Sequence, residues 1–396
     1  MTLSRITLKR GREKSVKNRH PWLFSGAIQR VQGQPEVGEL VDVYDKQNNF
    51  LARGAYNPRS QIRIRLLSWQ VDQQIDSDFW HGRLERAIAG RQTLINQTDT
   101  NAYRLVHSDG DGLPGLIVDQ YDEWLVVQFL SAAVEVHKET IVESLQQLLT
   151  PRGIYERSDT EARKKEALPQ TQGLLVGEEP PEQITIAEHG QSFLVDVRQG
   201  HKTGFYLDQR ENRRKVAKYA AGKRVLNAFS YTGGFAVSAG HAGASHITNL
   251  DSSAAVLELA RQNVSLNQPE RDDTYEVADV FQQLRHYQQT EQTFDLIILD
   301  PPKFVHNRSQ IEKGARGYKD INMWAMKILE SGGVLASFSC SGQVSADLFQ
   351  KILFGAAVDA GREVQIIERL TQGSDHPISL TCPESDYLKG LVCRVW

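Results

Sequence analysis

Cysteine and long apolar runs are the two features that this sequence has least of. Three cysteines among 396 residues argue against a disulfide framework and favour the reducing conditions of the cytoplasm. The longest apolar runs, LIIL and LVVQFL, are strand-sized, well short of the roughly 18 residues that a membrane helix needs. The basic start, MTLSRITLKRGREK, is followed by no apolar stretch, so we expect neither a signal peptide nor a membrane span.

The distribution of charge along the chain is uneven, although the net charge is only -3. Residues 1–70 carry 13 lysine and arginine side chains against five acidic ones, whereas the rest of the chain carries 33 against 44. A basic module joined to an acidic body indicates a module that meets a polyanion. Charge alone fits a solvated basic face equally well.

The length of the chain predicts two or three domains. Within residues 1–70, the stretches ELVDVYD and QIRIRLL alternate with period two and are separated by turn-rich segments, which predicts a small β-barrel. Arg59, Arg63 and Arg65 lie at or near the last strand of this barrel. The segment resembles a PUA domain, and this resemblance implies that these arginines contact RNA.

Residues 71–185 are expected to form a central α+β domain, in which a helical stretch is followed by two strands, a helix and a strand. The segment GEEPPEQ, residues 177–183, is acidic and contains a proline pair, so it is the best candidate for a linker. The acidic residues of HSDGDG do not have the spacing of an EF-hand loop. We therefore expect a solvated turn there, and no metal site.

Residues 186–396 alternate strands with helices, which is typical of a parallel, doubly wound sheet. The last two strands, within REVQIIERL and GLVCRVW, have only a loop between them. They predict an antiparallel terminal hairpin, which dinucleotide-binding Rossmann folds usually lack. The expected architecture is therefore multidomain α/β, with a Rossmann-like third domain of mostly parallel strands.

A cofactor site is expected where the first strands of this sheet end. The turn NAFSYTGGF places Gly233 where a ligand could approach the backbone, and it lacks the G-x-G-x-x-G pattern of NAD sites. Asp251 follows the next strand, where a carboxylate could accept ribose hydroxyls, and Asp279 follows the third, where it could receive an adenine amino group. Taken singly, Gly233 could close an ordinary turn and Asp251 could cap a helix. In this order they resemble the class I S-adenosylmethionine-dependent methyltransferases.

Asp300 ends the fourth strand in LDPPKF, and Cys340 ends the fifth in SFSCSG. A thiolate that adds to carbon 6 of a pyrimidine makes carbon 5 nucleophilic enough to accept a methyl group, and the helix expected after SCSG would favour that thiolate. Asp300 would hydrogen-bond nitrogen 3 and the amino group of cytosine. Pro301, Pro302 and Phe304 would form an apolar wall against a flipped base.

Other functions use the same residues differently. In methyl transfer to a purine nitrogen, Asp-Pro-Pro polarises an exocyclic amine and Cys340 only packs, while 5-methyluridine enzymes also combine DPP with a strand-end cysteine. A third alternative is a scaffold that only binds RNA. Cys393 alternates within LVCRV as a core residue would, and Cys382 is a weak rival nucleophile.

Several motifs taken together favour the first chemistry. HKTGFYLDQREN, NAFSYTGGFAV, LDSS, LDPPKF and SFSCSG, behind the barrel, resemble the bacterial large-subunit (23S) ribosomal RNA 5-methylcytosine methyltransferases over essentially the whole chain. This resemblance implies that Cys340 is the nucleophile, that Asp300 is its partner on the base and that 23S rRNA is the substrate. It also implies a set of residues that line the S-adenosylmethionine site: Asn227, Phe229, Tyr231, Gly233, Asp251 and Asp279.

Two features modify this expectation. Many RNA cytosine methyltransferases carry a second cysteine after the Pro of the fourth-strand motif, but here Lys303 follows Pro302, so another base must remove the carbon 5 proton. Lys303 is expected to contact substrate. In HKTGFYLDQREN, an opening helix with a capping pattern would explain Asp208 and Arg210, whereas the resemblance places some residues of this motif at the cofactor or the base, and Lys202 at the substrate. The polar segment 305–320 is expected to be a loop, either a lid over RNA or an ordinary solvated one. A homodimer is left open.

Overall fold

The structure, a computed structural model, describes residues 3–96 and 98–396. Compactness divides the chain into two units. Unit 1 comprises residues 1–186, 195–207 and 374–385, and unit 2 comprises residues 187–194, 208–373 and 386–396. Among the described helices, none is both long enough and apolar enough to cross a membrane.

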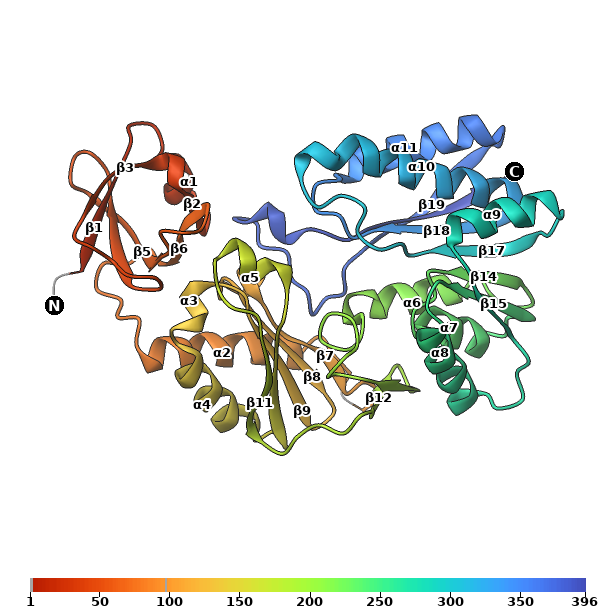
Figure 1. The fold of residues 1–396 in the computed structure, drawn as a ribbon, viewed down its shortest axis with the longest axis horizontal. Coiled ribbons are helices and arrows are strands. Elements are labelled where there is room, and N and C mark those ends of the chain that lie inside the picture. Colours follow the sequence, from red (N-terminus) through yellow and green to blue (C-terminus); the bar gives the residue numbers. More distant parts are fainter. Residues whose placement is uncertain (1–2, 97) are drawn as a thin grey trace. The chain divides into compact units, whose positions relative to one another are not determined.

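The first sheet of unit 1 has six strands in the order β2-β6-β5-β4-β1-β3 (Figure 1). Its strands are β1 (Ser4–Leu8), β2 (Trp22–Phe24), β3 (Ile28–Gln32), β4 (Leu40–Tyr44), β5 (Phe50–Tyr56) and β6 (Ile62–Ser68). The short helix α1 (Lys14–Lys17) precedes β2. Alternate residues such as Ile6, Val43 and Ile64 are fully buried, so the predicted period of two reflects the inner face of the sheet.

The second sheet of unit 1 has the order β11-β10-β9-β8-β7. Its strands are β7 (Ala102–His107), β8 (Leu116–Tyr121), β9 (Trp124–Phe129), β10 (Gly153–Ser158) and β11 (Thr171–Gly177), with helices α2 (Ser77–Gln92), α3 (Ala132–Glu135), α4 (Lys138–Leu149) and α5 (Glu161–Lys165). β9 and β10 are parallel because α3 and α4 lie between them in sequence, whereas the other pairs are antiparallel. This is the α+β layer that the sequence predicts for residues 71–185.

Separate hydrophobic clusters lie in these two sheets. One contains barrel residues from Ile6 to Leu66, and another runs from Leu67 to Ile154 around α2 and the second sheet. In the proposed linker, residues 177–183, Gly177 ends β11 and residues 178–183 are neither helix nor strand. The boundaries 1–70, 71–185 and 186–396 remain predictions, since compactness alone divides the chain in two.

Unit 2 contains a seven-stranded sheet in the order β16-β15-β14-β17-β18-β20-β19. Its strands are β14 (Arg224–Ala228), β15 (His246–Asp251), β16 (Thr274–Val277), β17 (Phe294–Leu299), β18 (Leu329–Ser339), β19 (Val364–Thr371) and β20 (Lys389–Val395). β20 runs antiparallel to both of its neighbours, β18 and β19, and the other described pairs of this sheet are parallel. The expected parallel sheet with an antiparallel terminal hairpin is thus confirmed.

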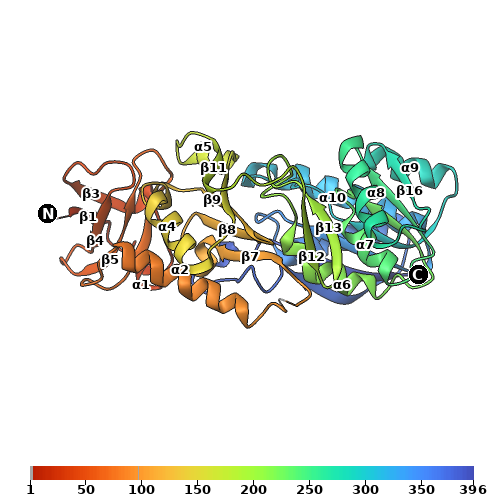
Figure 2. The same ribbon diagram turned by 90° about the horizontal axis from the view of Figure 1, so that it is seen from below.

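Helices cover both faces of this sheet, with α6, α7 and α8 on one side and α9, α10 and α11 on the other (Figure 1). Their bounds are α6 (Arg210–Ala217), α7 (Gly234–His241), α8 (Ala254–Asn267), α9 (Val280–Gln289), α10 (Ile311–Ile328) and α11 (Ala346–Ala360). Figure 2 shows the hairpin of β12 (Ile184–Glu188) and β13 (Gln191–Val195), whose strands pair with each other.

Two local predictions were wrong. The segment 305–320 is not a loop throughout, because α10 begins at Ile311 and buries Tyr318 and Ile321. In addition, α11 begins at Ala346, six residues after Cys340. A helix dipole acts mainly on its own first turn, so this helix does not provide the local activation that the sequence suggested for the thiol.

Candidate active site

The fourth and fifth strands of the unit 2 sheet end side by side. β17 and β18 are parallel, and Leu299 pairs with Ser337. Asp300 leaves β17 directly after this pair, and Cys340 leaves β18 three residues after Ser337. Both side chains are half-buried. The structure therefore brings the two predicted reactive groups to neighbouring strand ends.

The hydroxyl of Ser341, which is fully buried, ties these two segments together. It accepts a hydrogen bond from the backbone N–H of Val305 at 3.3 Å, and it shares a hydrogen bond of 2.9 Å with the hydroxyl of Tyr318 on α10. Burial raises the pKa of Tyr318, so that hydroxyl stays protonated. These bonds fix the backbone on both sides of the strand ends.

The predicted apolar wall is only partly apolar. Pro301 is buried, whereas Pro302 and Lys303 are exposed. Phe304 packs in an aromatic cluster, 4.6 Å from the ring of Tyr318 and 5.8 Å from the ring of Phe281. Its rigid partners hold this loop in place, and they leave Pro302 and Lys303 accessible to a substrate.

The turn after β14 has an unusual backbone. Phe229, Tyr231 and Gly233 have φ values of 57°, 46° and 78°, in the left-handed region. For a non-glycine residue this conformation costs on the order of 1–3 kcal/mol and is often found at functional sites. At Gly233 a Cβ atom would lie 3.0 Å from the Cβ of Ala260. The turn therefore needs glycine there, as the sequence indicates.

A buried polar network holds this turn. The amide of Asn227 donates to the Ser230 hydroxyl at 3.1 Å and to Oδ1 of Asn249 at 3.0 Å. Ser230 in turn donates to the same Oδ1 at 3.1 Å. All three residues are buried. The side chain of Asn227 thus helps to hold the left-handed turn of residues 229–233 in place.

The two predicted cofactor carboxylates lie at the ends of β15 and β16. Asp251 accepts the backbone N–H of Tyr231 on one oxygen at 3.0 Å and that of Ser253 on the other at 3.1 Å. A carboxylate has about four acceptor positions, so Asp251 keeps capacity for two hydroxyls. Asp279 is exposed and caps α9 through the N–H of Gln282.

Sequence reasoning missed several residues around these motifs. Ser230, Asn249, Phe281, Tyr318 and Lys389 have no place in the predicted site. Asn249 and Lys389 carried a usable signal, because each is a polar side chain in a mostly buried strand. Tyr318 became a candidate only once residues 311–320 were seen to be helical.

In unit 1, the three barrel arginines have different surroundings. Arg59 is exposed, and Arg63 donates to the carbonyl oxygen of Asn57 at 3.4 Å. Arg65 forms an ion pair of 2.8 Å with Glu166. Arg65 thus has a structural partner, and its contact with RNA stays a prediction.

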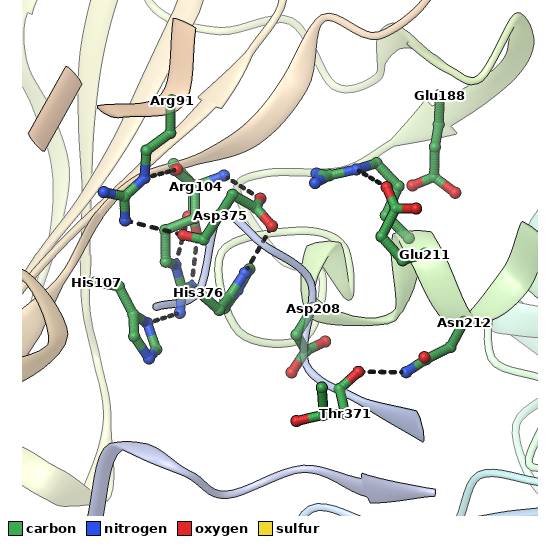
Figure 3. A network of polar contacts seen from close by, with 12 residues as sticks. Arg91, Arg104, His107, Glu188, Asp208, Glu211, Asn212, Thr371, Asp375 and His376 are labelled. Atoms are coloured by element: carbon green, nitrogen blue, oxygen red, sulfur yellow. Dashed lines mark hydrogen bonds and ion pairs between the residues drawn. The ribbon is translucent and has the colours of Figure 1, made fainter. Parts of the chain in front are cut away.

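The motif HKTGFYLDQREN is divided between the two units. Lys202, in unit 1, places its ammonium 4.4 Å from the ring centroid of Tyr206. In unit 2, Asp208 accepts the hydroxyl of Tyr387 at 2.7 Å. Asn212, on α6, donates to the carbonyl of Thr371 at 3.0 Å (Figure 3). The second half of the motif therefore anchors the strands of the terminal hairpin.

The acidic residues of HSDGDG do not form the expected solvated turn. Asp111 is bound by both terminal nitrogens of Arg91, each at 2.7 Å, and Asp109 accepts the indole N–H of Trp22 at 2.9 Å. Arg91 also donates to the carbonyl of Asp375 (Figure 3). These partners are remote in sequence, so the local pattern did not reveal them.

The cysteines differ in environment. Cys393 is fully buried in β20, as predicted, and burial raises its pKa to about 12. Burial also raises the pKa of Cys382, which lies with His20 and Glu384 at spacings that could suit a metal. However, Nδ1 of His20 accepts the N–H of Trp22, so neutral His20 carries its proton on Nε2 and donates it to Glu384 at 3.1 Å. In this tautomer, His20 and Glu384 are joined by a hydrogen bond.

Two known families match this chain. Residues 6–69 match the family described as a PUA-like domain, and residues 103–391 match the family described as S-adenosylmethionine-dependent methyltransferase. Proteins named ribosomal RNA large subunit methyltransferase I, from Serratia proteamaculans and Yersinia pestis, are each 50% identical over 392 residues, which is 99% of this chain and 99% of theirs.

Solved structures give the same fold. A Streptococcus mutans protein assigned as a SAM-dependent methyltransferase superposes with a TM-score of 0.85 at 24% identity. A further structure, assigned as a methyltransferase and solved in complex with SAH, has a TM-score of 0.87 at 24% identity. Both alignments cover 100% of each chain. At this identity the likeness concerns the fold.

Proposed function

This chain belongs to the S-adenosylmethionine-dependent methyltransferases, in the family that includes ribosomal RNA large subunit methyltransferase I, and from that membership we propose that it forms 5-methylcytosine in large-subunit (23S) ribosomal RNA. The observation that carries the proposal is that Cys340 and Asp300 each directly follow one of two adjacent parallel strands, β18 and β17. An rRNA substrate also implies that the protein works in the cytoplasm.

The turn after β14 fits the cofactor of this family. S-adenosylmethionine supplies an electrophilic methyl group when it is bound. The left-handed conformations of Phe229, Tyr231 and Gly233 open the end of β14 to a ligand. Asp251 retains acceptor capacity for ribose hydroxyls. Asp279 and Phe281 follow β16, where an adenine ring would need a polar and an aromatic neighbour. We propose that these residues, with Asn227 holding the turn, form the cofactor site.

The protein's own groups would then perform the following steps. The Cys340 thiolate forms a bond to carbon 6 of cytosine, and the displaced electron pair makes carbon 5 the nucleophile that accepts the methyl group. Asp300, in its protonated form, donates to nitrogen 3 and accepts from the amino group. A base then removes the carbon 5 proton, the bond between sulfur and carbon 6 breaks, and the thiolate returns.

RNA would be held by groups outside this centre. Arg59 and Arg63 of the PUA-like barrel supply positive charge, and the exposed Lys303 and Pro302 adjoin Asp300. Lys202 and Arg65 complete the substrate contacts that we propose. The homodimer that the sequence leaves open is tested by light scattering of the purified chain.

Nucleoside mass spectrometry of large-subunit rRNA after incubation with the purified protein tests this function. We expect 5-methylcytosine with the unaltered protein and none with Cys340→Ala, because the nucleophile is gone. Cys393→Ala is the matched control and should keep the product, since that thiol is buried in β20. Methylated adenine, methylated guanine or 5-methyluridine as the product would overturn the base assignment.

A trapping experiment tests the covalent step separately. RNA that contains 5-azacytidine has nitrogen at position 5, so no proton can be removed there and the adduct should persist. We expect a stable complex with the unaltered protein and none with Cys340→Ala. Near-normal methylation by Cys340→Ala would refute the covalent mechanism even if the product were 5-methylcytosine.

A further inference from the structure

Lys389 lies beside the candidate nucleophile. It is the first residue of β20 and pairs with Ser339, the last residue of β18, and Cys340 follows directly. Lys389 is only 8% exposed. A lysine this deeply buried is uncommon unless something compensates its charge. The mechanism outlined above does not yet use this residue.

Lys389 donates hydrogen bonds to two backbone carbonyls. Its ammonium donates to the carbonyl of Ser341 at 3.0 Å and to the carbonyl of Tyr387 at 2.8 Å. Both acceptors are neutral, so these bonds leave a whole positive charge at the loop that carries Cys340. Burial lowers the pKa of Lys389, while the negative charges of Asp386 and of a Cys340 thiolate raise it.

The charged and titratable groups around this position come from several elements. Lys303 follows β17 and lowers the pKa of Lys389, whereas Asp386 lies just before β20. Asp300 is the residue after β17. The hydroxyl of Tyr318, on α10, shares a hydrogen bond with the hydroxyl of Ser341. Lys389 differs from the exposed Lys303 because its own hydrogen bond reaches the residue after Cys340. It is thus the cation fixed most directly to the nucleophile's loop.

The residue that accepts one of these hydrogen bonds, Tyr387, is itself held in place. Its hydroxyl donates a hydrogen bond to Asp208 at 2.7 Å. Gln372 also accepts the backbone N–H of Tyr387, at 3.1 Å. Asp208 belongs to HKTGFYLDQREN, so this motif contributes to the same arrangement. The ammonium is therefore held in one place before any substrate binds.

Building on the proposed function, we propose that Lys389 is a positioning residue whose fixed ammonium group stabilises the Cys340 thiolate. The thiol proton passes to water, and Lys389 keeps all of its protons. The same charge stabilises the thiolate again when the bond between sulfur and carbon 6 breaks. This role replaces the helix α11 dipole as the local source of activation.

Alkylation of Cys340 by iodoacetamide as a function of pH tests this role in the full-length protein, without RNA or cofactor. The modified peptide is quantified by mass spectrometry. Three variants separate charge from hydrogen bonding: Lys389→Arg keeps the charge, Lys389→Gln keeps a donor without charge, and Lys389→Met keeps neither. We expect the pH midpoint of alkylation to rise by about one pH unit in Lys389→Gln and Lys389→Met. In Lys389→Arg it should stay near the value of the unaltered protein.

An unchanged midpoint in both Lys389→Gln and Lys389→Met would overturn the proposal. Buried Cys382 and Cys393 report folding, since they become modified only if a variant unfolds. The readout does not depend on methyl transfer: a shifted midpoint without any 5-methylcytosine refutes the function and supports the role of Lys389. Formation of 5-methylcytosine together with an unshifted alkylation midpoint supports the function and refutes the role of Lys389. In an active enzyme, Lys389→Gln should lose about tenfold in rate near pH 7 and recover as the pH rises.

Discussion

At the scale of single residues, Gly233 combines two demands in one position. Its φ of 78° is unfavourable for any side chain, and an added Cβ would press against Ala260. We expect Gly233→Ala to lower the free energy of unfolding by about 1–2 kcal/mol and to weaken S-adenosylmethionine binding about tenfold or more. Urea unfolding and isothermal titration calorimetry measure the two effects.

Gly243 provides the control for that substitution. Its φ is 87°, but an added Cβ would meet no atom within 4 Å. Gly243→Ala should therefore share the backbone strain while leaving cofactor binding unchanged. Equal loss of cofactor binding in both variants would mean that the turn at Gly233 has no special part in the site.

His107 predicts a dependence of stability on pH. Burial lowers its pKa well below the usual value, and the nearby His376 and Arg104 lower it further. The unfolded chain therefore binds more protons than the folded one between the folded pKa and about 6.5. Stability should rise with pH across this window and fall as the pH drops below about 6.5, by at most about 1.4 kcal/mol per unit.

Thermal unfolding between pH 5 and 7.5 measures this effect. His107→Gln removes the titrating group, so its melting temperature should depend less on pH than that of the unaltered protein. Identical pH profiles would show that other groups control acid stability.

At the scale of elements, a buried ion pair joins β12 to α6 within unit 2. Glu188 accepts the guanidinium of Arg213 at 2.7 Å, and their side chains are 2% and 3% exposed. Removing Glu188 takes away the carboxylate that faces the buried guanidinium of Arg213. Glu188→Ala should therefore cost about 3–5 kcal/mol of unfolding free energy, as measured by urea unfolding.

An exposed pair on α11 gives the comparison. Lys351 and Asp347 interact at 2.8 Å with side chains 70% and 74% exposed. Asp347→Ala should change the unfolding free energy by less than about 1 kcal/mol. If the two substitutions cost the same, burial is not what makes the Glu188 pair important.

Element prediction from sequence succeeded where a pattern was local. The alternation of strands and helices predicted the parallel sheet, and the loop between the last two strands predicted the antiparallel hairpin. The start of α10 was missed because its polar, glycine-containing first turns hid the helical spacing of the buried residues Gly314, Tyr318 and Ile321. In this segment the polar composition indicates a loop more strongly than the helical spacing of its few apolar residues indicates a helix.

At the scale of the whole molecule, the sequence placed Asp300 and Cys340 together because parallel strands end at the same edge of a sheet. It could not place Lys389, since its position depends on the register between β18 and β20, which are separated by α11 and β19. The partners of Asp109 and Asp111 were missed because Trp22 and Arg91 come from β2 and α2, outside the local pattern of HSDGDG. Strand order follows from local patterns, whereas side-chain pairing across long loops does not.

The chain passes between its two units five times, and this has a consequence for how it is made. Unit 1 needs residues 374–385, which leave the ribosome only after the whole segment 208–373. At about 5–20 residues per second, the first 207 residues wait roughly 10 to 30 seconds for the piece that completes them. Unit 1 is thus incompletely folded during this part of translation, and chaperones have that interval in which to bind it.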